Sequence, residues 1–331
     1  MCLAALACCL GFVLTSAAGA QTTGTEDVLL VGNSSAGTVD VFSAVAPFTK
    51  LQTVNAIPDG ATPQDPVQAL AYPTLTSKVG INYVQDIALS PDAKTLYVSR
   101  GYLGDVAAFD LSNPLHPMIW RTQIHSLRAD HLEISPDGKR LFDSAITSDV
   151  IEVLDSSTGT LVGAIPAGDY PHTLTFTPDG STLYNGSLGV NTLDTATSQT
   201  PPTDGRHWLE AIDPNTLLLK RPPCQFPEGI RPFAFTPDGQ TMYLQLSYYN
   251  GIVKYDPVTC TTLGKLDLPL QGPGLTTAPH DYPNQAAQHG IVVSPDGQWL
   301  CSAGTIDNYA TLTHLPEFSP AATTIIPVGQ E

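Results

Sequence analysis

Five stretches of the chain repeat one pattern of apolar and polar positions around a short polar turn. Each copy alternates apolar and polar residues up to Ser or Thr, continues with Pro, Asp and Gly or Ala, and then resumes an apolar run. The copies align without a gap: QDIALSPDAKTLYVS from Gln85, DHLEISPDGKRLFDS from Asp130, HTLTFTPDGSTLYNG from His172, RPFAFTPDGQTMYLQ from Arg231 and HGIVVSPDGQWLCSA from His289. A period of two on both sides of a Pro-Asp-Gly turn predicts two antiparallel β-strands joined tightly.

A third and a fourth apolar run complete each repeat. The third run ends in Asp in four copies, at Asp110, Asp155, Asp213 and Asp256, and a fourth run is seen from Leu161. The turn prolines lie 42 to 59 residues apart. Four antiparallel strands at this period are typical of one blade of a β-propeller, and the longer spacings predict inserted loops over 188–206 and 267–287.

The two ends of the chain bear on the number of blades. Residues 28–44 match the second and third strands of a repeat, with no first strand before them, and the chain stops at TTIIPVGQE, which reads as a fourth strand. We therefore expect an all-β protein, a β-propeller of four-stranded blades with six blades recognisable. The pattern favours a seven-bladed ring truncated at its C-terminus over a ring that closes with six blades.

The first twenty residues differ from the rest. Residues 3–18 are apolar and small, and Ala18-Gly19-Ala20 precedes Gln21, which predicts a signal peptide over 1–20 cleaved near Ala20-Gln21. A single propeller domain would then span 21–331, secreted or periplasmic. The apolar run is too short for a membrane span, so we expect no membrane insertion.

Charge and cysteine content narrow the possibilities further. The net charge of −17 leaves no basic surface for phosphates, which excludes nucleic acid as a partner. Outside the signal segment three cysteines remain, Cys224, Cys260 and Cys301. They allow one disulfide, between Cys224 and Cys260, or three buried thiols. We expect a monomer.

The candidate functional residues come from one register position, six places before each turn proline. We call these the lead positions: Gln85, Asp130, His172, Arg231 and His289. The residues that follow them include Asp86 and His131, and the positions four and two before each turn proline are apolar. Because first strands line the central channel of a propeller, we expect the lead positions to meet at one mouth of that channel.

Three kinds of chemistry fit these residues. The ligand-binding candidates are Gln85, Asp86, Asp130, His131, His172, Arg231, His289 and Tyr248, the last as a ring that stacks on a ligand. His131, His172 and His289 with a carboxylate could hold a divalent metal that activates water. For catalysis, His172 or His289 would serve as general base while Arg231 holds an oxyanion. The alternative is that these polar groups only bind water and join blades.

The repeat resembles the YVTN-type β-propeller family, which includes YncE-like and lactonase-like propellers. The resemblance covers residues 28–331 and rests on the five turns and the pairs Leu96-Tyr97, Leu141-Phe142, Leu183-Tyr184 and Met242-Tyr243 after them. It implies a seven-bladed fold but no single function. Two functions remain open. One is a secreted propeller that binds a small molecule, glycan or protein at its channel mouth. The other is a lactonase- or isomerase-type enzyme that uses the His/Asp/Arg cluster, with or without a divalent metal. We favour the first because no complete catalytic motif is visible.

Overall fold

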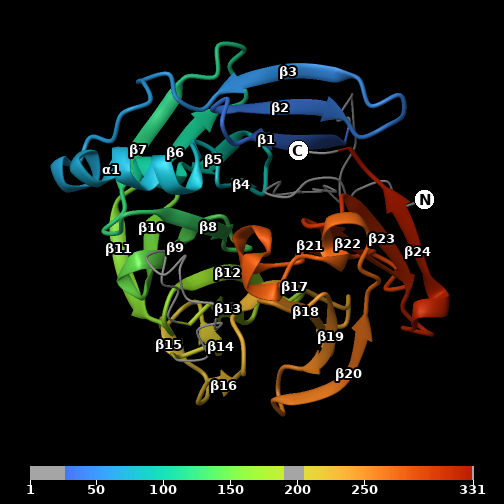
Figure 1. The fold of residues 1–331 in the computed structure, drawn as a ribbon. Helices are drawn as coiled ribbons and strands as arrows, with labels where there is room; N and C mark the ends of the chain where they lie inside the picture. The colour runs from blue at the N-terminus through green and yellow to red at the C-terminus, as the bar shows by residue number, and fades with distance from the viewer. Residues whose placement is uncertain (1–26, 190–204, 330–331) are drawn as a thin grey trace, which may run out of the picture. The chain divides into compact units, whose positions relative to one another are not determined.

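The computed structural model describes residues 27–189 and 205–329 (Figure 1). In these residues the chain forms six antiparallel sheets, each a meander of strands consecutive in sequence. The predicted signal peptide lies outside the described residues, as does most of the predicted loop 188–206. No helix in the described part of the chain is long and apolar enough to cross a membrane.

The chain divides into two compact units at Pro166/Ala167, and each is described by itself. The first unit holds blades 1 to 3. Blade 1 is β1 (Val28–Asn33), β2 (Thr38–Ser43) and β3 (Lys50–Asn55). Blade 2 is β4 (Asp86–Leu89), β5 (Thr95–Ser99), β6 (Asp105–Asp110) and β7 (Met118–Gln123). Blade 3 is β8 (Ala129–Ile134), β9 (Arg140–Ala145), β10 (Val150–Asp155) and β11 (Leu161–Pro166).

The second unit holds blades 4 to 6. Blade 4 is β12 (Pro171–Phe176), β13 (Leu183–Ser187), β14 (Trp208–Asp213) and an outer strand in two pieces, β15 (Leu218–Leu219) and β16 (Cys224–Gln225). Blade 5 is β17 (Ile230–Phe235), β18 (Met242–Leu246), β19 (Gly251–Asp256) and β20 (Thr261–Asp267). Blade 6 is β21 (Gln288–Val293), β22 (Trp299–Gly304), β23 (Tyr309–His314) and β24 (Thr323–Pro327).

These sheets confirm the prediction of an all-β propeller with six recognisable blades. Blade 1 has three strands in the described residues, as its missing first strand predicts, and β24 is the fourth strand read from TTIIP. The seven-bladed parent and the single domain 21–331 stay predictions.

The repeated turn is held by its own side chains. Ser135 Oγ donates to Asp137 Oδ1 (2.6 Å) and accepts from the Arg140 N–H (2.9 Å), and Gly138 N–H donates to Ser135 O (2.8 Å). A hydroxyl also donates to the turn aspartate in the other four copies, from Ser90, Thr177, Thr236 and Ser294. The Ser/Thr and Asp of the motif therefore stabilise the turn through hydrogen bonds within it.

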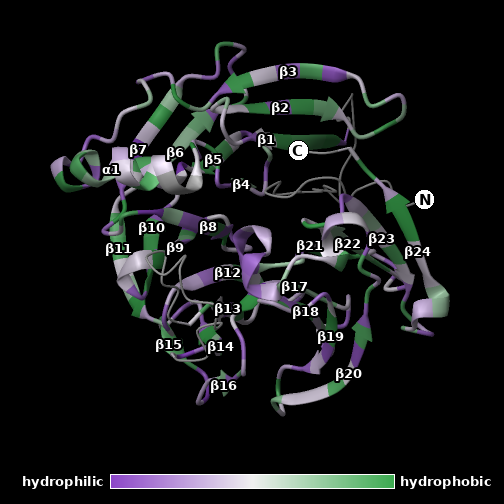
Figure 2. Ribbon diagram, viewed as in Figure 1, coloured by the Kyte–Doolittle hydropathy of each residue, from purple (hydrophilic) through white to green (hydrophobic). Residues whose placement is uncertain are grey.

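The cores lie between neighbouring blades and use the apolar positions of the repeat. Between blades 1 and 2, Leu30, Val39, Val98 and Phe109 pack together and are fully buried. Hydrophobic residues follow strands such as β1 and β2 in Figure 2. Since blades 1 and 2 each bury one face against the other, the repeat pattern alone is enough to specify this packing.

Two features break the repeat. Helix α1 (Pro66–Val79) lies between blades 1 and 2, with Asp65 accepting from Gln68 N–H (2.9 Å) at its start. The predicted loop 267–287 contains three short 3₁₀ turns, η3 (Gly272–Leu275), η4 (Pro279–Asp281) and η5 (Pro283–Gln285). Asp307 fastens this loop by accepting from Gln271 N–H and Gly274 N–H, both at 2.7 Å.

The cysteines resolve the open choice between a disulfide and three thiols. Cys224 and Cys260 form a disulfide with an S–S distance of 2.02 Å, and Cys301 is a buried free thiol. The disulfide joins the outer strand of blade 4 to the turn between β19 and β20 of blade 5.

Candidate functional site

The lead positions are polar residues that the fold buries at the start of the first strands. Their exposed fractions are 4% for Gln85, 0% for Asp130, 3% for His172, 3% for Arg231 and 7% for His289. Burying a polar side chain is unfavourable unless it is hydrogen-bonded, so five buried polar residues at one register position require an explanation.

A β-bulge coincides with the lead position in four blades. The pairing register shifts between Ala129 and Leu132 in β8, and between Pro171 and Thr173 in β12. It shifts between Ile230 and Phe233 in β17, and between Gln288 and Ile291 in β21. A bulge redirects side chains and is common beside functional sites. In the sequence, the bulges are indicated by neighbouring residues that interrupt the alternation of apolar and polar positions, such as Arg231-Pro232 and His289-Gly290.

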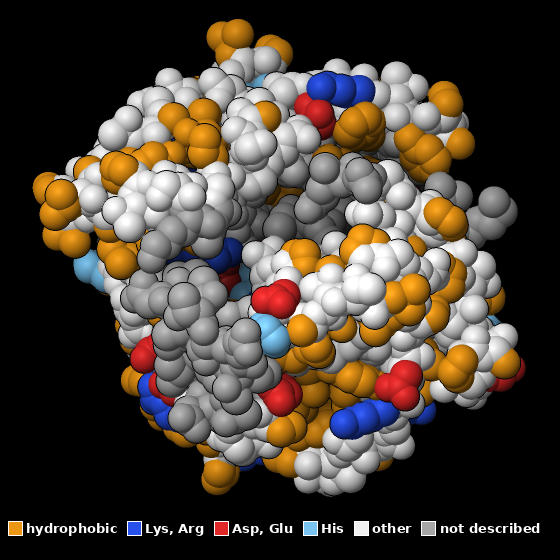
Figure 3. Space-filling model, in the orientation of Figure 1, with side chains coloured by type: hydrophobic (Ala, Val, Ile, Leu, Met, Phe, Trp, Pro, Cys, Tyr) orange, Lys and Arg blue, Asp and Glu red, His pale blue; other side chains and the backbone are white. Residues whose placement is uncertain are grey.

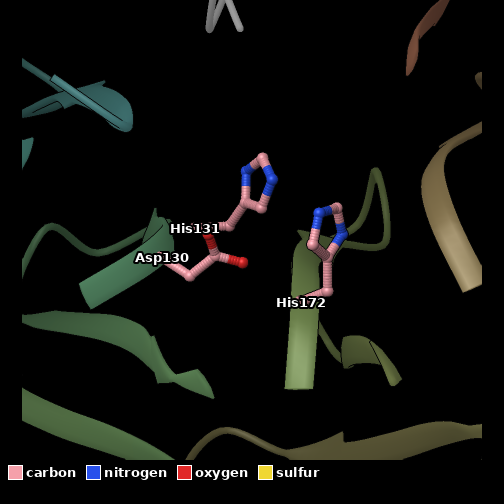
Figure 4. A group of neighbouring side chains, drawn as sticks. All are labelled: Asp130, His131 and His172. Atoms are coloured by element: carbon pink, nitrogen blue, oxygen red, sulfur yellow. The ribbon is translucent and has the colours of Figure 1, made fainter. Parts of the chain in front are cut away.

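In the second unit two lead residues meet, and the third lies on a strand that packs against both of theirs. The strand that carries Arg231, β17, packs against both β12 and β21. The rings of His172 and His289 meet edge to face, with centroids 5.4 Å apart. Figure 4 shows the His172 side chain at the start of β12. The lead residues of blades 4 and 6 are thus in contact, and a shared site of the lead positions stays a prediction.

Arg231 and Tyr248 extend this group. Arg231 Nε donates to Ser247 Oγ (2.9 Å), and the next residue, Tyr248, is half-buried with a left-handed backbone (φ 64°). Burial raises the pKa of Tyr248, which the Arg231 charge lowers and the Glu228 charge raises. The Tyr248 phenol thus lies in the electrostatic field of the lead residue Arg231, and its role in ligand binding stays a prediction.

Gln245 holds the backbone of the residue after His289, a contact that was not predicted from the sequence. Its side chain donates to Gly290 O (3.0 Å) and accepts from Gly290 N–H (2.9 Å), so blade 5 grips the bulge of blade 6 through both amide groups. Gln245 is fully buried in the apolar strand β18. A single glutamine within the otherwise apolar strand MYLQL could have indicated a buried polar contact.

The first unit contains a second polar group built from Asp86, Arg128, Asp130 and His131. His131 Nδ1 lies 2.9 Å from Asp86 Oδ2, which also accepts from Leu132 N–H (3.1 Å). Arg128 forms an ion pair with Asp130 at 2.8 Å. Burial opposes the charged imidazole of His131, but the charge of Asp86 and its hydrogen bond outweigh burial and raise the pKa of His131. Figure 4 shows Asp130 and His131 as neighbours on β8.

Gln85 has a structural role. Its side-chain oxygen accepts from Asn82 Nδ2, and its backbone N–H donates to Ser99 O (2.9 Å). It connects the segment before blade 2 to that blade, which matches the alternative in which a lead residue only joins structural elements.

The predicted metal ligands are divided between the units. His172 and His289 belong to the second unit, and His131 belongs to the first. Within either unit taken alone, no three described His, Cys, Asp or Glu side chains bring ligand atoms within 4.8 Å of one another. The three-histidine metal site, and a divalent metal as cofactor, stay predictions.

Comparisons with known proteins identify the fold. No protein-family model matches the chain, and no curated protein matches its sequence. Among solved structures 1558 chains match, so the likeness selects a fold and not a function. One of them is titled Kuenenia stuttgartiensis hydrazine synthase, with a TM-score of 0.64 and 16% sequence identity over 92% of this chain and 84% of that one.

Proposed function

We propose that this chain is an exported β-propeller that binds a small anionic molecule through the lead positions of blades 4 to 6. The observation that carries the proposal is the contact of His172 with His289 at bulges of two strands that both pack against β17, where Arg231 also lies in a bulge. These residues are no more than 7% exposed, so a flat protein surface would scarcely reach them, and we propose a small molecule as the ligand.

The donor set favours an anion. A guanidinium presents several N–H donors in a plane that matches a carboxylate or phosphate, and imidazole N–H groups add to it. The Tyr248 hydroxyl supplies a further donor in the field of Arg231. All three lead residues of this unit are basic or imidazole side chains, whereas the lead residue of blade 3 is Asp130.

Enzymatic activity of lactonase or isomerase type is the second candidate. It is favoured by the contact between His172 and His289, whose ring centroids are 5.4 Å apart, because paired imidazoles can exchange protons with a substrate. Arg231 would then stabilise the negative charge that develops in the reaction. A divalent metal at His131, His172 and His289 belongs to this second proposal.

Export and the finer family assignment are part of the same proposal. Disulfides persist in oxidising compartments, so the Cys224–Cys260 bond supports secretion or a periplasmic location together with the signal-like residues 1–20. The recurring turns support a YVTN-type, YncE-like or lactonase-like propeller. We propose a monomer without a nucleic-acid partner. On the described part of the face drawn in Figure 3, Lys and Arg side chains are scattered and not gathered into a patch.

A thermal-shift screen tests this proposal. The panel pairs small carboxylates and phosphate esters with neutral amides and alcohols of the same shape. A ligand at one hundred times its dissociation constant adds about 2.7 kcal/mol to stability, which should raise the unfolding temperature by several degrees. We expect acids to raise it and their amides to leave it unchanged.

The matched variants are Arg231→Gln and Lys139→Gln. Each removes one positive charge, and the Lys139 side chain is 80% exposed and belongs to blade 3, outside the unit that carries Arg231. The shift should disappear in Arg231→Gln and persist in Lys139→Gln. Equal shifts for acids and amides, or an unchanged shift in a folded Arg231→Gln variant, would contradict the proposal.

A further inference from the structure

Two acidic residues face each other across neighbouring strands of blade 3. Asp143 on β9 and Glu152 on β10 are directly opposite in the antiparallel register. Their exposed fractions are 0% and 3%. Side chains at opposite positions on one face of a sheet have Cβ atoms about 5 Å apart. Two carboxylates this close and this buried cannot both carry a charge at an acceptable energy.

The hydrogen bonds of the pair are incomplete as long as both groups are ionised. Glu152 Oε1 accepts from His125 N–H (3.1 Å) and lies 2.8 Å from His125 Nδ1. In the described part of the chain, Glu152 Oε2 and both oxygens of Asp143 have no hydrogen-bond partner of normal geometry. A single proton between the two residues would convert these unsatisfied acceptors into a hydrogen-bonded pair.

Blade 4 contains the same arrangement with an amide in place of one acid. Asn185 and Glu210 are directly opposite on β13 and β14, and both are fully buried. Asn185 Nδ2 donates to Glu210 Oε2 (2.6 Å). Gly168 N–H donates to the same oxygen (3.2 Å), from the loop before β12, as His125 does from the loop before β8. Asparagine has the shape of a protonated aspartic acid and, like it, offers a donor.

We propose that Asp143 is a protonated carboxylic acid at neutral pH and donates its hydrogen to Glu152, so that blade 3 is held by a proton as blade 4 is held by an amide. This proton-binding pair is separate from the lead positions and does not depend on the proposed ligand.

The surroundings of Asp143 favour its neutral form. Burial raises the pKa of Asp143 most, and the charges of Asp130, Glu152 and Asp86 raise it further, while the nearby Ser99 hydroxyl lowers it. The positive groups of this region are engaged with the neighbouring acids. Arg128 pairs with Asp130, and His131 is hydrogen-bonded to Asp86.

The pair makes blade 3 sensitive to alkaline pH. Because the pKa of Asp143 is higher in the folded chain than the value of about 4 in an unfolded one, its stabilising effect is complete at low pH. It is lost progressively as the pH rises through the folded-state pKa. Loss of the proton adds a negative charge beside Asp130, which lies in the bulge of β8. We expect that bulge to loosen first.

Reciprocal variants test this inference. Asp143→Asn gives blade 3 the pair of blade 4, and Asn185→Asp gives blade 4 the pair of blade 3. The measurement is the folding equilibrium constant from denaturant unfolding between pH 5 and pH 9. One linked proton changes this constant about tenfold per pH unit. In the wild type the folding equilibrium constant should fall by up to tenfold per pH unit because of this proton. That fall should be absent in Asp143→Asn, and Asn185→Asp should show a second fall of the same size.

Other acids do not obscure the comparison. Burial raises the pKa of Glu133 to about 8, with the charge of Asp86 adding to it, and burial raises the pKa of Glu210 to about 7. Both give a slope of the same sign, but they are present in the wild type and in Asp143→Asn. A folded Asp143→Asn variant whose pH slope equals that of the wild type would overturn the inference.

A measurement on the wild type covers the case in which a variant fails to fold. With ¹³C at the aspartate carboxyl carbons, NMR should show one aspartate that remains protonated at pH 6 in the folded protein. Glutamates carry no label and do not interfere. If every aspartate of the folded protein is ionised at pH 6, the inference is wrong.

Discussion

The last residue of the repeated turn depends on the blade before it. Gly138, Gly239 and Gly297 have left-handed backbones with φ of 74°, 70° and 68°. A Cβ on these glycines would lie 3.0, 3.3 and 3.2 Å from the turn proline of the preceding blade. Blade 2 has Ala93 at this position, with φ 56°, and the blade before it has no such turn in its described residues. Ala93 therefore meets no turn proline of a preceding blade in the described residues.

Opposite effects should follow from exchanging these two residues. Gly138→Ala should lower the free energy of unfolding by about 1–2 kcal/mol, because a left-handed backbone is unfavourable for alanine and Pro91 leaves little room. Ala93→Gly should raise it by about 0.5–1 kcal/mol, since relief of the left-handed strain exceeds the added entropy of the unfolded chain. Urea unfolding measures both, and effects of equal sign would refute the explanation.

At the scale of the element, the strands could be predicted because their signal is local. Each blade consists of strands with a period of two around a turn of characteristic sequence. Residues such as Asp92 therefore indicate the turn, and residues such as Leu96 indicate the strand. Helix α1 could not be predicted in this way, because its apolar residues form no stripe. Val67 and Leu70 on it are 67% and 83% exposed. The helix is instead fixed by hydrogen bonds to residues distant in sequence, because Gln68 Nε2 donates to Tyr102 O (2.7 Å) and to Leu127 O.

The register of the candidate residues within their strands could be predicted, but the contacts around them could not. The register of the turns located His172, Arg231 and His289 at one place in each first strand. The bulges, the grip of Gln245 on Gly290 and the opposition of Asp143 to Glu152 depend on pairing between strands, which no single segment encodes. The disulfide likewise depends on contact between blades 4 and 5.

The disulfide between these elements should contribute substantially to stability. Cys224 and Cys260 are 36 residues apart in the sequence. Closing a loop of this size lowers the conformational entropy of the unfolded chain, which raises the free energy of unfolding by about 3–4 kcal/mol at 25 °C. The double variant Cys224→Ser/Cys260→Ser should lose about that much. Reductant should destabilise the wild type to a similar degree and leave the double variant unaffected. A wild-type unfolding curve that reductant does not move would show that the bond contributes little.

At the scale of the whole molecule, acids fall into two classes that titrate in opposite directions. In the exposed turns, the hydroxyl of Thr177 and the Ser181 amide lower the pKa of Asp179 to about 2. Hydrogen bonds from the turn Ser or Thr hydroxyl also lower the pKa of the other four turn aspartates. Inside the blades, burial raises the pKa of Glu210 to about 7 and that of Glu133 to about 8. The net charge of −17 adds repulsion as the pH rises.

These shifts predict a stability maximum on the mildly acidic side. The lowered groups stabilise the fold above an unfolded pKa of about 4 and lose that effect as the pH falls further. The raised groups stabilise it at low pH and lose their effect as the pH rises toward 7 and 8. Thermal unfolding across pH 3 to 9 should peak near pH 5. A peak at pH 8 or above would mean that the buried acids are ionised without penalty.

The central claim is that one register position, shared by blades 4 to 6, forms a single anion-binding site. Calorimetric titration of the strongest-binding acid from the thermal-shift screen into His172→Gln, Arg231→Gln and His289→Gln tests it most directly. We predict that each folded variant loses at least about tenfold in affinity, the loss of one charge-assisted hydrogen bond, while Lys139→Gln binds as the wild type does. Unchanged affinity in all three variants would contradict the account.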